Sequence, residues 1–231
     1  MEYLIAPQSF ADRESARMGR AAAWTVFLLE MVYVVTTVLG LLSLKSPQDP
    51  IGDPFFTIME LLIILMAPLM VVVMVALHAY ALPEAKAYSL TALVLMMLTA
   101  GITSGVHFVI LAVSRQIAAL GLAGAPLFFS FRWPSVAYAL DILAWDWFFA
   151  LAMLFAAPVM KGGRLEMSVR ILMFASGVLS LAGLIGVPLE NMQVRNIGII
   201  GYAVVAPVVF LLLGIVFGRA RAAWMGTNGN A

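Results

Sequence analysis

Six apolar segments, each long enough to cross a lipid bilayer, are the feature that most constrains the fold of this chain. They occupy residues 23–44, 55–77, 89–113, 134–157, 168–188 and 196–217. A helix that crosses the hydrocarbon core needs about 20 mostly apolar residues, and it satisfies its backbone hydrogen bonds internally. The chain is 64% hydrophobic and only 11% charged, whereas soluble domains are about 45–50% apolar. The sequence therefore predicts an all-α, polytopic (multi-pass) integral membrane protein with a bundle of six transmembrane helices.

The joints between these spans are short and rich in turn-forming residues, so residues 23–217 are expected to form one membrane domain. Lysine and arginine are enriched in cytoplasmic loops. If the N-terminus is cytoplasmic, nine basic residues fall on the inner side and four on the outer side. The inner group is Arg13, Arg17, Arg20, Lys86, Lys161, Arg164, Arg170, Arg219 and Arg221, and the outer group is Lys45, Arg115, Arg132 and Arg195.

This charge bias predicts that both termini are cytoplasmic and that the protein lies in a cytoplasmic (inner or plasma) membrane. The N-terminal segment 1–22 is then a cytoplasmic or interfacial segment, and residues 218–231 form a cytoplasmic tail. Residues 121–131, within the longest outer joint, are expected to lie in the membrane interface, with a re-entrant lid over a cavity as the alternative. Small residues at helical spacing are expected to be helix-packing positions: Gly101 and Gly105 in the third span, and Ser176, Ser180 and Gly183 in the fifth.

Four acidic residues lie inside the predicted spans: Glu30, Glu60, Asp141 and Asp146. An acidic residue at the centre of a span costs roughly 2.5–3.5 kcal/mol on insertion scales, so such residues usually face protein or water. Glu60 and Asp141 fall in the outer part of their spans, Asp146 falls near the middle, and Glu30 falls in the inner third. Because charged carboxyl groups are costly to bury, at least two of the four are expected to be neutral at pH 7 unless a cation is bound.

The outer half of the bundle is the predicted site. His107 and Ser104 lie in the outer part of the third span, and Arg195 begins the sixth span at the outer surface, from where its side chain could extend toward the same layer. These residues are expected to form one polar cluster with Glu60 and Asp141.

The two aspartates of the fourth span are expected to serve different environments. Tyr138, Asp141 and Trp145 share one helix face, whereas Asp146 is five residues from Asp141, an offset of about 140° in an α-helix. Asp141 would then join the polar cluster, and Asp146 would face a neighbouring helix or a cavity wall.

Several kinds of chemistry find no support in the sequence. The chain has no cysteine, which excludes thiol nucleophiles and disulfides. Its two histidines, His78 and His107, lie at opposite membrane ends, so no metal site is predicted, and no cofactor-binding motif is found. A net charge of +1 gives no reason to expect nucleic acid as a partner; the expected partner is the lipid bilayer, and the oligomeric state stays open.

Three functions fit this pattern. The first is binding or translocation of a small solute or cation, linked to protons exchanged by Glu60 and Asp141 and relayed by His107. The second is an intramembrane enzyme that acts on a lipid or isoprenoid, with Asp141, Asp146 or Glu60 as the general acid and Tyr138, Trp145 and Trp147 lining the pocket. The third is a structural or assembly subunit whose polar residues join helices.

Overall fold

The computed structural model describes residues 10–46, 49–122 and 124–228, and within these ranges it contains helices and no strand. Six helical stretches are long and apolar enough to cross a membrane, which confirms the predicted all-α architecture with six candidate spans. Their bounds are Glu14–Leu42, Phe55–Tyr80, Pro83–Ser114, Val136–Val159, Arg164–Gly186 and Met192–Ala220.

The first two spans are single helices, α1 (Phe10–Leu42) and α2 (Phe55–Tyr80), and the other four are composite. The third joins a 3-10 turn (Pro83–Ala85), α3 (Lys86–Val109) and a π-helical segment (Ile110–Ser114), and short helices α4 (Arg115–Ala119) and α5 (Ala125–Phe128) follow it. The fourth joins α6 (Val136–Ile142), a π-helix (Leu143–Phe149), α7 (Ala150–Ala156) and a 3-10 turn (Ala157–Val159). The fifth is α8 (Arg164–Gly183) with a 3-10 turn (Leu184–Gly186), and the sixth joins α9 (Met192–Ile199), a π-helix (Ile200–Val205) and α10 (Ala206–Asn228).

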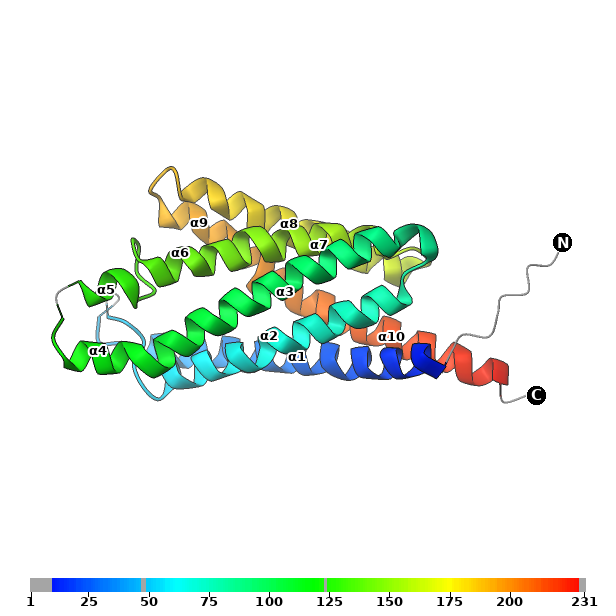
Figure 1. Cartoon of the computed structure of the whole chain (residues 1–231), viewed down its shortest axis with the longest axis horizontal. Helices are drawn as coiled ribbons and strands as arrows, with labels where there is room; N and C mark the ends of the chain where they lie inside the picture. Colours follow the sequence, from blue (N-terminus) through cyan, green and yellow to red (C-terminus); the bar gives the residue numbers. More distant parts are fainter. Residues whose placement is uncertain (1–9, 47–48, 123, 229–231) are drawn as a thin grey trace.

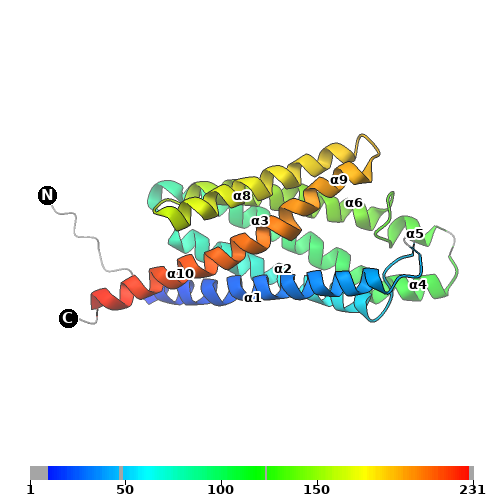
Figure 2. The same ribbon diagram turned by 180° about the vertical axis from the view of Figure 1, so that it is seen from behind.

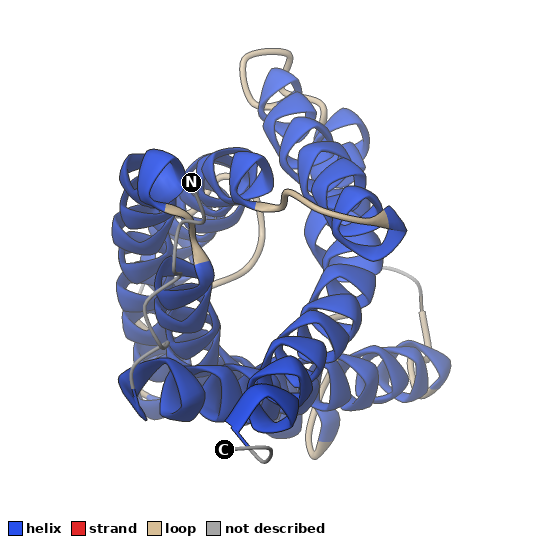
Figure 3. Ribbon diagram, turned by 90° about the vertical axis from the view of Figure 1, so that its right-hand side faces the viewer, coloured by secondary structure: helices blue, strands red, loops and turns tan. Residues whose placement is uncertain are grey.

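The spans pack in a closed ring that follows the chain order (Figure 3). Helix α1 contacts α2 and α10, α2 contacts α3, α3 contacts α7, and α8 contacts α7, α9 and α10. The core inside this ring is built from large apolar side chains that are fully buried, including Met70, Met74, Phe149, Met153 and Phe210. Large apolar side chains also remain exposed on the outer faces, such as Leu28 and Leu65, as expected where lipid is the solvent.

The start of α1 and the end of α10 lie at the same end of the bundle, and α4 and α5 lie at the opposite end (Figures 1 and 2). We call these the terminal end and the loop end. An even number of spans produces this arrangement. The sequence predicts a boundary at residue 22, between an N-terminal segment and the first span. The structure differs, because α1 begins at Phe10 and continues into the first span without a break near residue 22.

The predicted small-residue contacts have two outcomes. The stripe in α8 packs as expected: a methyl group at Gly183 would lie 2.8 Å from the carbonyl oxygen of Arg195, and Ser176 Oγ donates to the carbonyl oxygen of Gly201 at 2.9 Å. By contrast, Gly101 and Gly105 of α3 have no heavy atom of another element within 4 Å of the position of an added methyl group. Their predicted packing role is therefore wrong among the described residues, because this face of α3 points away from the neighbouring helices.

Candidate functional site

A buried ion-pair cluster joins three spans near the loop end. His107 of α3 lies between Glu60 of α2 and Asp141 of α6, and we call these three residues the triad. The distance from His107 Nδ1 to Glu60 Oε2 is 2.8 Å, and the distance from His107 Nε2 to Asp141 Oδ1 is 3.4 Å. The side chains of His107 and Glu60 are about 95% buried, and that of Asp141 is 14% exposed. The predicted convergence of Glu60, His107 and Asp141 is confirmed.

The two sides of the imidazole differ. The contact with Glu60 is a hydrogen bond, whereas the contact with Asp141 is an ion pair without hydrogen-bond geometry, since neither His107 Nε2 nor Asp141 Oδ1 has a hydrogen-bond partner among the described residues. Asp141 is also the more exposed of the two carboxyl groups. The triad therefore has a closed side at Glu60 and a looser side at Asp141.

Aromatic residues of the loop before α6 cover the triad. The ring of Phe131 lies 5.0 Å from the imidazole of His107, and Phe131 and Trp133 each contact Tyr138 with ring centroids 6.5 Å apart. The described residues of the segment 121–131 lie at the loop end, with α5 (Ala125–Phe128) beyond the start of α6 (Figure 1). Its last residue, Phe131, nevertheless covers the buried imidazole.

A second buried ion pair joins the fourth and sixth spans. Arg195 Nε donates to Asp146 Oδ2 at 3.0 Å, with side chains that are 3% and 0% exposed. Arg195 also donates to the hydroxyl of Tyr138 at 3.4 Å, and its guanidinium lies over the rings of Tyr138 (5.2 Å) and Tyr202 (5.8 Å). The expectation that Arg195 lies at the outer surface beside the triad is thus wrong: Arg195 is buried and its ion pair is with Asp146.

Glycine residues make this second pair possible. A methyl group at Gly198 of α9 would overlap Asp146 Oδ1, and one at Gly201 would lie 2.5 Å from Ser180 Oγ. The sixth span therefore approaches the fourth and fifth closely enough for the buried arginine to reach Asp146. Close backbone approach through small residues is the usual packing device in lipid.

Asp141 and Asp146 have different partners, His107 and Arg195, as predicted. Their angular offset around the helix is smaller than the predicted value. A π-helix bonds residue i to residue i+5, so the π-helix Leu143–Phe149 reduces the angular offset between Asp141 and Asp146. The two carboxyl groups interact electrostatically, and Tyr138 is an electrostatic neighbour of both aspartates and of Arg195. Tyr138 therefore links the triad to the Arg195–Asp146 pair.

The other predicted site residues lie outside these clusters. Ser104 is half-buried, and within the described part of the chain it makes no hydrogen bond to the triad. Trp145 packs against Phe149 and Tyr202 with ring centroids 5.3 Å and 5.2 Å apart. Glu30 is buried in α1, apart from the triad, and its Oε2 has no hydrogen-bond partner among the described residues.

Sequence reasoning missed Tyr202 and Phe131. Tyr202 follows Arg195 by seven residues, two helical turns, so its position on the same face could have been noticed. Phe131 lies in a loop, where no periodicity exists to indicate its contact with His107. Only the tertiary structure places it.

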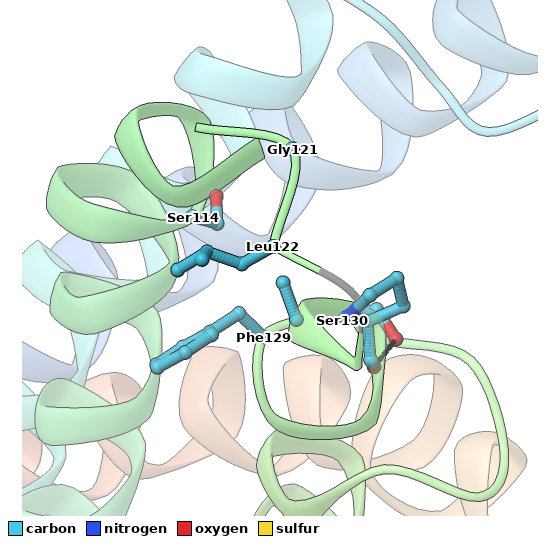
Figure 4. Close-up of a pocket in the computed structure, with 7 residues that line it drawn as sticks. Ser114, Gly121, Leu122, Phe129 and Ser130 are labelled. Atoms are coloured by element: carbon cyan, nitrogen blue, oxygen red, sulfur yellow. Dashed lines mark hydrogen bonds between the residues drawn. The ribbon is translucent and has the colours of Figure 1, made fainter. Parts of the chain in front are cut away.

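The triad is not arranged as a metal site. The histidine lies between the two carboxyl groups, and no group of three or more His, Asp or Glu side chains in the described ranges converges to hold a metal ion. A pocket of about 300 Å³ does lie at the loop end, lined by Ser114, Gly121, Leu122, Ala125, Pro126, Phe129 and Ser130. Figure 4 shows it beside the loop at Gly121 and Leu122. Neither the triad nor the Arg195–Asp146 pair lines this pocket.

No protein-family model, no curated protein and no solved structure matches this chain.

Proposed function

We propose that the protein binds protons at the Glu60–His107–Asp141 triad and couples them to movement of a small solute or cation across the membrane. The observation that supports this proposal is one buried imidazole whose two ring nitrogens face carboxyl groups from two other helices. An imidazole can bind a proton at one nitrogen and release another from the second, which makes histidine a suitable proton relay.

The charges of the triad favour this role. With both carboxyl groups ionised and the imidazole protonated, the triad carries one net negative charge, since two carboxylates oppose one cation. A buried net charge is costly, so binding one proton or one monovalent cation neutralises the site. Arg195 and Asp146 already neutralise each other. The triad is therefore the buried cluster that can bind a further proton or monovalent cation.

The asymmetry of the triad supplies a direction. Asp141 is partly exposed at the side where the imidazole contact is loose, and Glu60 is buried at the side where the hydrogen bond is tight. A proton would enter at Asp141, pass to His107 Nε2, and leave from Nδ1 to Glu60. Phe131, whose ring lies 5.0 Å from the imidazole, would control access from the loop end.

A cytoplasmic location of both termini is part of this proposal. Burial of Arg195 removes it from the outer loops, so the basic residues number nine at the terminal end against three at the loop end. The excess of Lys and Arg at the terminal end supports cytoplasmic termini. Protons would then enter the triad from the non-cytoplasmic side.

A proton-flux assay tests the proposal. The protein is reconstituted into liposomes that contain a pH-sensitive dye, and proton movement is recorded under an imposed potential with Na⁺, K⁺, Li⁺ or ammonium outside. We expect wild-type protein to move protons with at least one of these cations, and His107→Gln, Glu60→Gln and Asp141→Asn to lose this flux. Glu84→Gln, at an exposed ion pair with Lys161, is the matched control and is expected to retain it.

Titration of His107 gives a second measurement. His78→Gln leaves one histidine in the chain, so the nitrogen NMR signal of an isotope-labelled imidazole reports on His107 alone. Its titration midpoint is expected to move in Glu60→Gln and in Asp141→Asn. If the three triad variants lower stability but leave proton flux unchanged, the triad only joins helices and the proposal is wrong.

A further inference from the structure

A cationic side chain without an anionic partner lies between the first and sixth spans. The guanidinium carbon of Arg20 in α1 lies 4.3 Å from the centre of the Trp24 ring, one helical turn further along the chain. Arg20 is half-buried, and within the described part of the chain it has no carboxylate or hydrogen-bond partner. Its donors are therefore available to a ligand from outside the protein.

The sixth span restrains both side chains. Helices α1 and α10 pack side by side (Figure 2). A methyl group at Gly214 of α10 would overlap the Trp24 ring, and one at Gly218 would lie 3.5 Å from Cδ and 3.8 Å from Nη1 of Arg20. The indole thus lies against one glycine of α10, and the guanidinium lies between the indole and the next glycine. We call Arg20, Trp24, Gly214 and Gly218 the seam.

A contact with α2 gives the depth of the seam. A methyl group at Gly19 would overlap the Cβ of Ala76, and α2 ends at Tyr80. Arg20 therefore lies level with the last turns of α2, where that span reaches the terminal end. Tryptophan is enriched at this boundary between hydrocarbon and water, so the group outside the protein at this depth is a lipid headgroup.

The charges around the seam select the kind of headgroup. Arg17 and Arg219 flank Arg20 along α1 and α10, and both are exposed. The nearby acid, Glu14, lies 4.0 Å from Arg17, so a net positive charge remains. It attracts a headgroup with a net negative charge and repels the cationic amine of a zwitterionic one. The planar guanidinium presents paired donors that match the oxygens of a phosphate group.

We propose that the seam binds the phosphate group of an anionic phospholipid. Arg20 donates to the phosphate oxygens, and Trp24 holds the guanidinium in place. The bound lipid contacts α1 and α10 together, the two helices that close the ring, and so stabilises their pairing. This site lies at the opposite end of the bundle from the triad, and it does not depend on proton transport.

Lipid binding to the full chain tests the proposal. Native mass spectrometry in a neutral detergent compares phosphatidylglycerol with phosphatidylcholine of the same acyl chains. We expect wild type to bind phosphatidylglycerol more tightly, and Arg20→Gln to weaken this binding at least about tenfold, as for loss of a hydrogen bond to a charged group. Arg164→Gln removes an exposed arginine outside the seam and is the matched control, expected to bind like wild type.

Three results of this experiment would overturn the proposal. Equal weakening by Arg20→Gln and Arg164→Gln would mean that only the general positive charge attracts lipid. Equal binding of the two lipids by wild type would mean that the headgroup is not recognised. Displacement of the lipid by soluble glycerol phosphate would mean that the seam is a site for free phosphate, and we expect no displacement.

The role of Trp24 has its own test. Trp24→Leu keeps every charge but should weaken phosphatidylglycerol binding about two- to fivefold, the size of an exposed cation–π contact. Trp147→Leu, at a tryptophan that is 44% exposed in the fourth span, is the control and should bind like wild type. Unchanged binding in Trp24→Leu would overturn the positioning role of the indole.

Thermal unfolding shows whether each variant is folded and gives a second readout, because a ligand that binds the folded state stabilises it. Phosphatidylglycerol should raise the unfolding temperature of wild type and Arg164→Gln more than phosphatidylcholine does. In Arg20→Gln the two lipids should have the same effect. A preference for phosphatidylglycerol that survives in Arg20→Gln would overturn the proposal.

Discussion

The buried Arg195–Asp146 pair leads to a prediction about stability. Asp146→Asn keeps the size of the side chain but removes the charge that opposes a guanidinium only 3% exposed and 3.0 Å away. Arg195 would then be a buried cation that keeps the hydroxyl of Tyr138, the rings of Tyr138 and Tyr202, and a longer-range interaction with Asp141.

The expected cost follows from these contacts. Removing one partner of a buried pair typically costs about 3–5 kcal/mol, because the other charge stays buried without compensation. Cation–π contacts return about 0.5–2 kcal/mol, so we expect Asp146→Asn to lower the free energy of unfolding by about 3 kcal/mol. Arg195→Gln should cost a similar amount. The double variant, which buries two neutral amides, should cost no more than either single change.

Unfolding in mixed detergent and dodecyl sulfate micelles, followed by the fluorescence of the five tryptophans and by circular dichroism, measures these changes. The coupling energy from the double-mutant cycle is expected to exceed about 1.7 kcal/mol, the upper end for neutral interhelical hydrogen bonds in lipid. Glu84→Gln, which breaks the exposed pair with Lys161, is the control and should show no measurable change. Additive effects of the two single changes would refute the reasoning, because they would mean that the two side chains do not depend on each other.

Three further predictions follow from close packing, the aromatic cover and the charge bias. Gly198→Ala should destabilise the protein about as much as loss of the buried ion pair, since its methyl group would overlap the Asp146 carboxyl group. Gly101→Ala, where no other element lies within 4 Å, should be neutral or stabilising by up to about 1 kcal/mol. Unfolding in mixed micelles measures both changes. Phe131→Ala should speed hydrogen exchange at the His107 imidazole, as measured by NMR; an unchanged rate would mean that the ring does not limit access. Because the chain has no cysteine, Lys161→Cys and Lys45→Cys each provide one labelling site, and a membrane-impermeant maleimide added to intact cells should label only Lys45→Cys. The opposite pattern would reverse the proposed orientation.

The convergence of Glu60, His107 and Asp141 could be predicted from depth alone. In a helix that crosses a bilayer, position in the sequence translates directly into depth, and polar groups at the same depth in a helical ring seek one another because lipid offers no partner. The same reasoning failed for Arg195. Depth placed it near the outer surface, and no sequence pattern showed that the glycines beside it let the sixth span approach Asp146 so closely.

By itself, the sequence determined that the chain has six candidate spans and the position of each carboxyl group along its span, because apolar length and helical rise are local properties. The predicted bounds lie near the observed ones except at the start of the first span, where α1 begins at Phe10. Only the tertiary structure decided which helices are neighbours, that a π-helix brings the two aspartates closer together, that Phe131 covers His107, and that Gly101 and Gly105 face outward. These outcomes depend on how helices rotate and pack against one another. That rotation is set by the fit of many side chains at once, and no single segment of the sequence contains it.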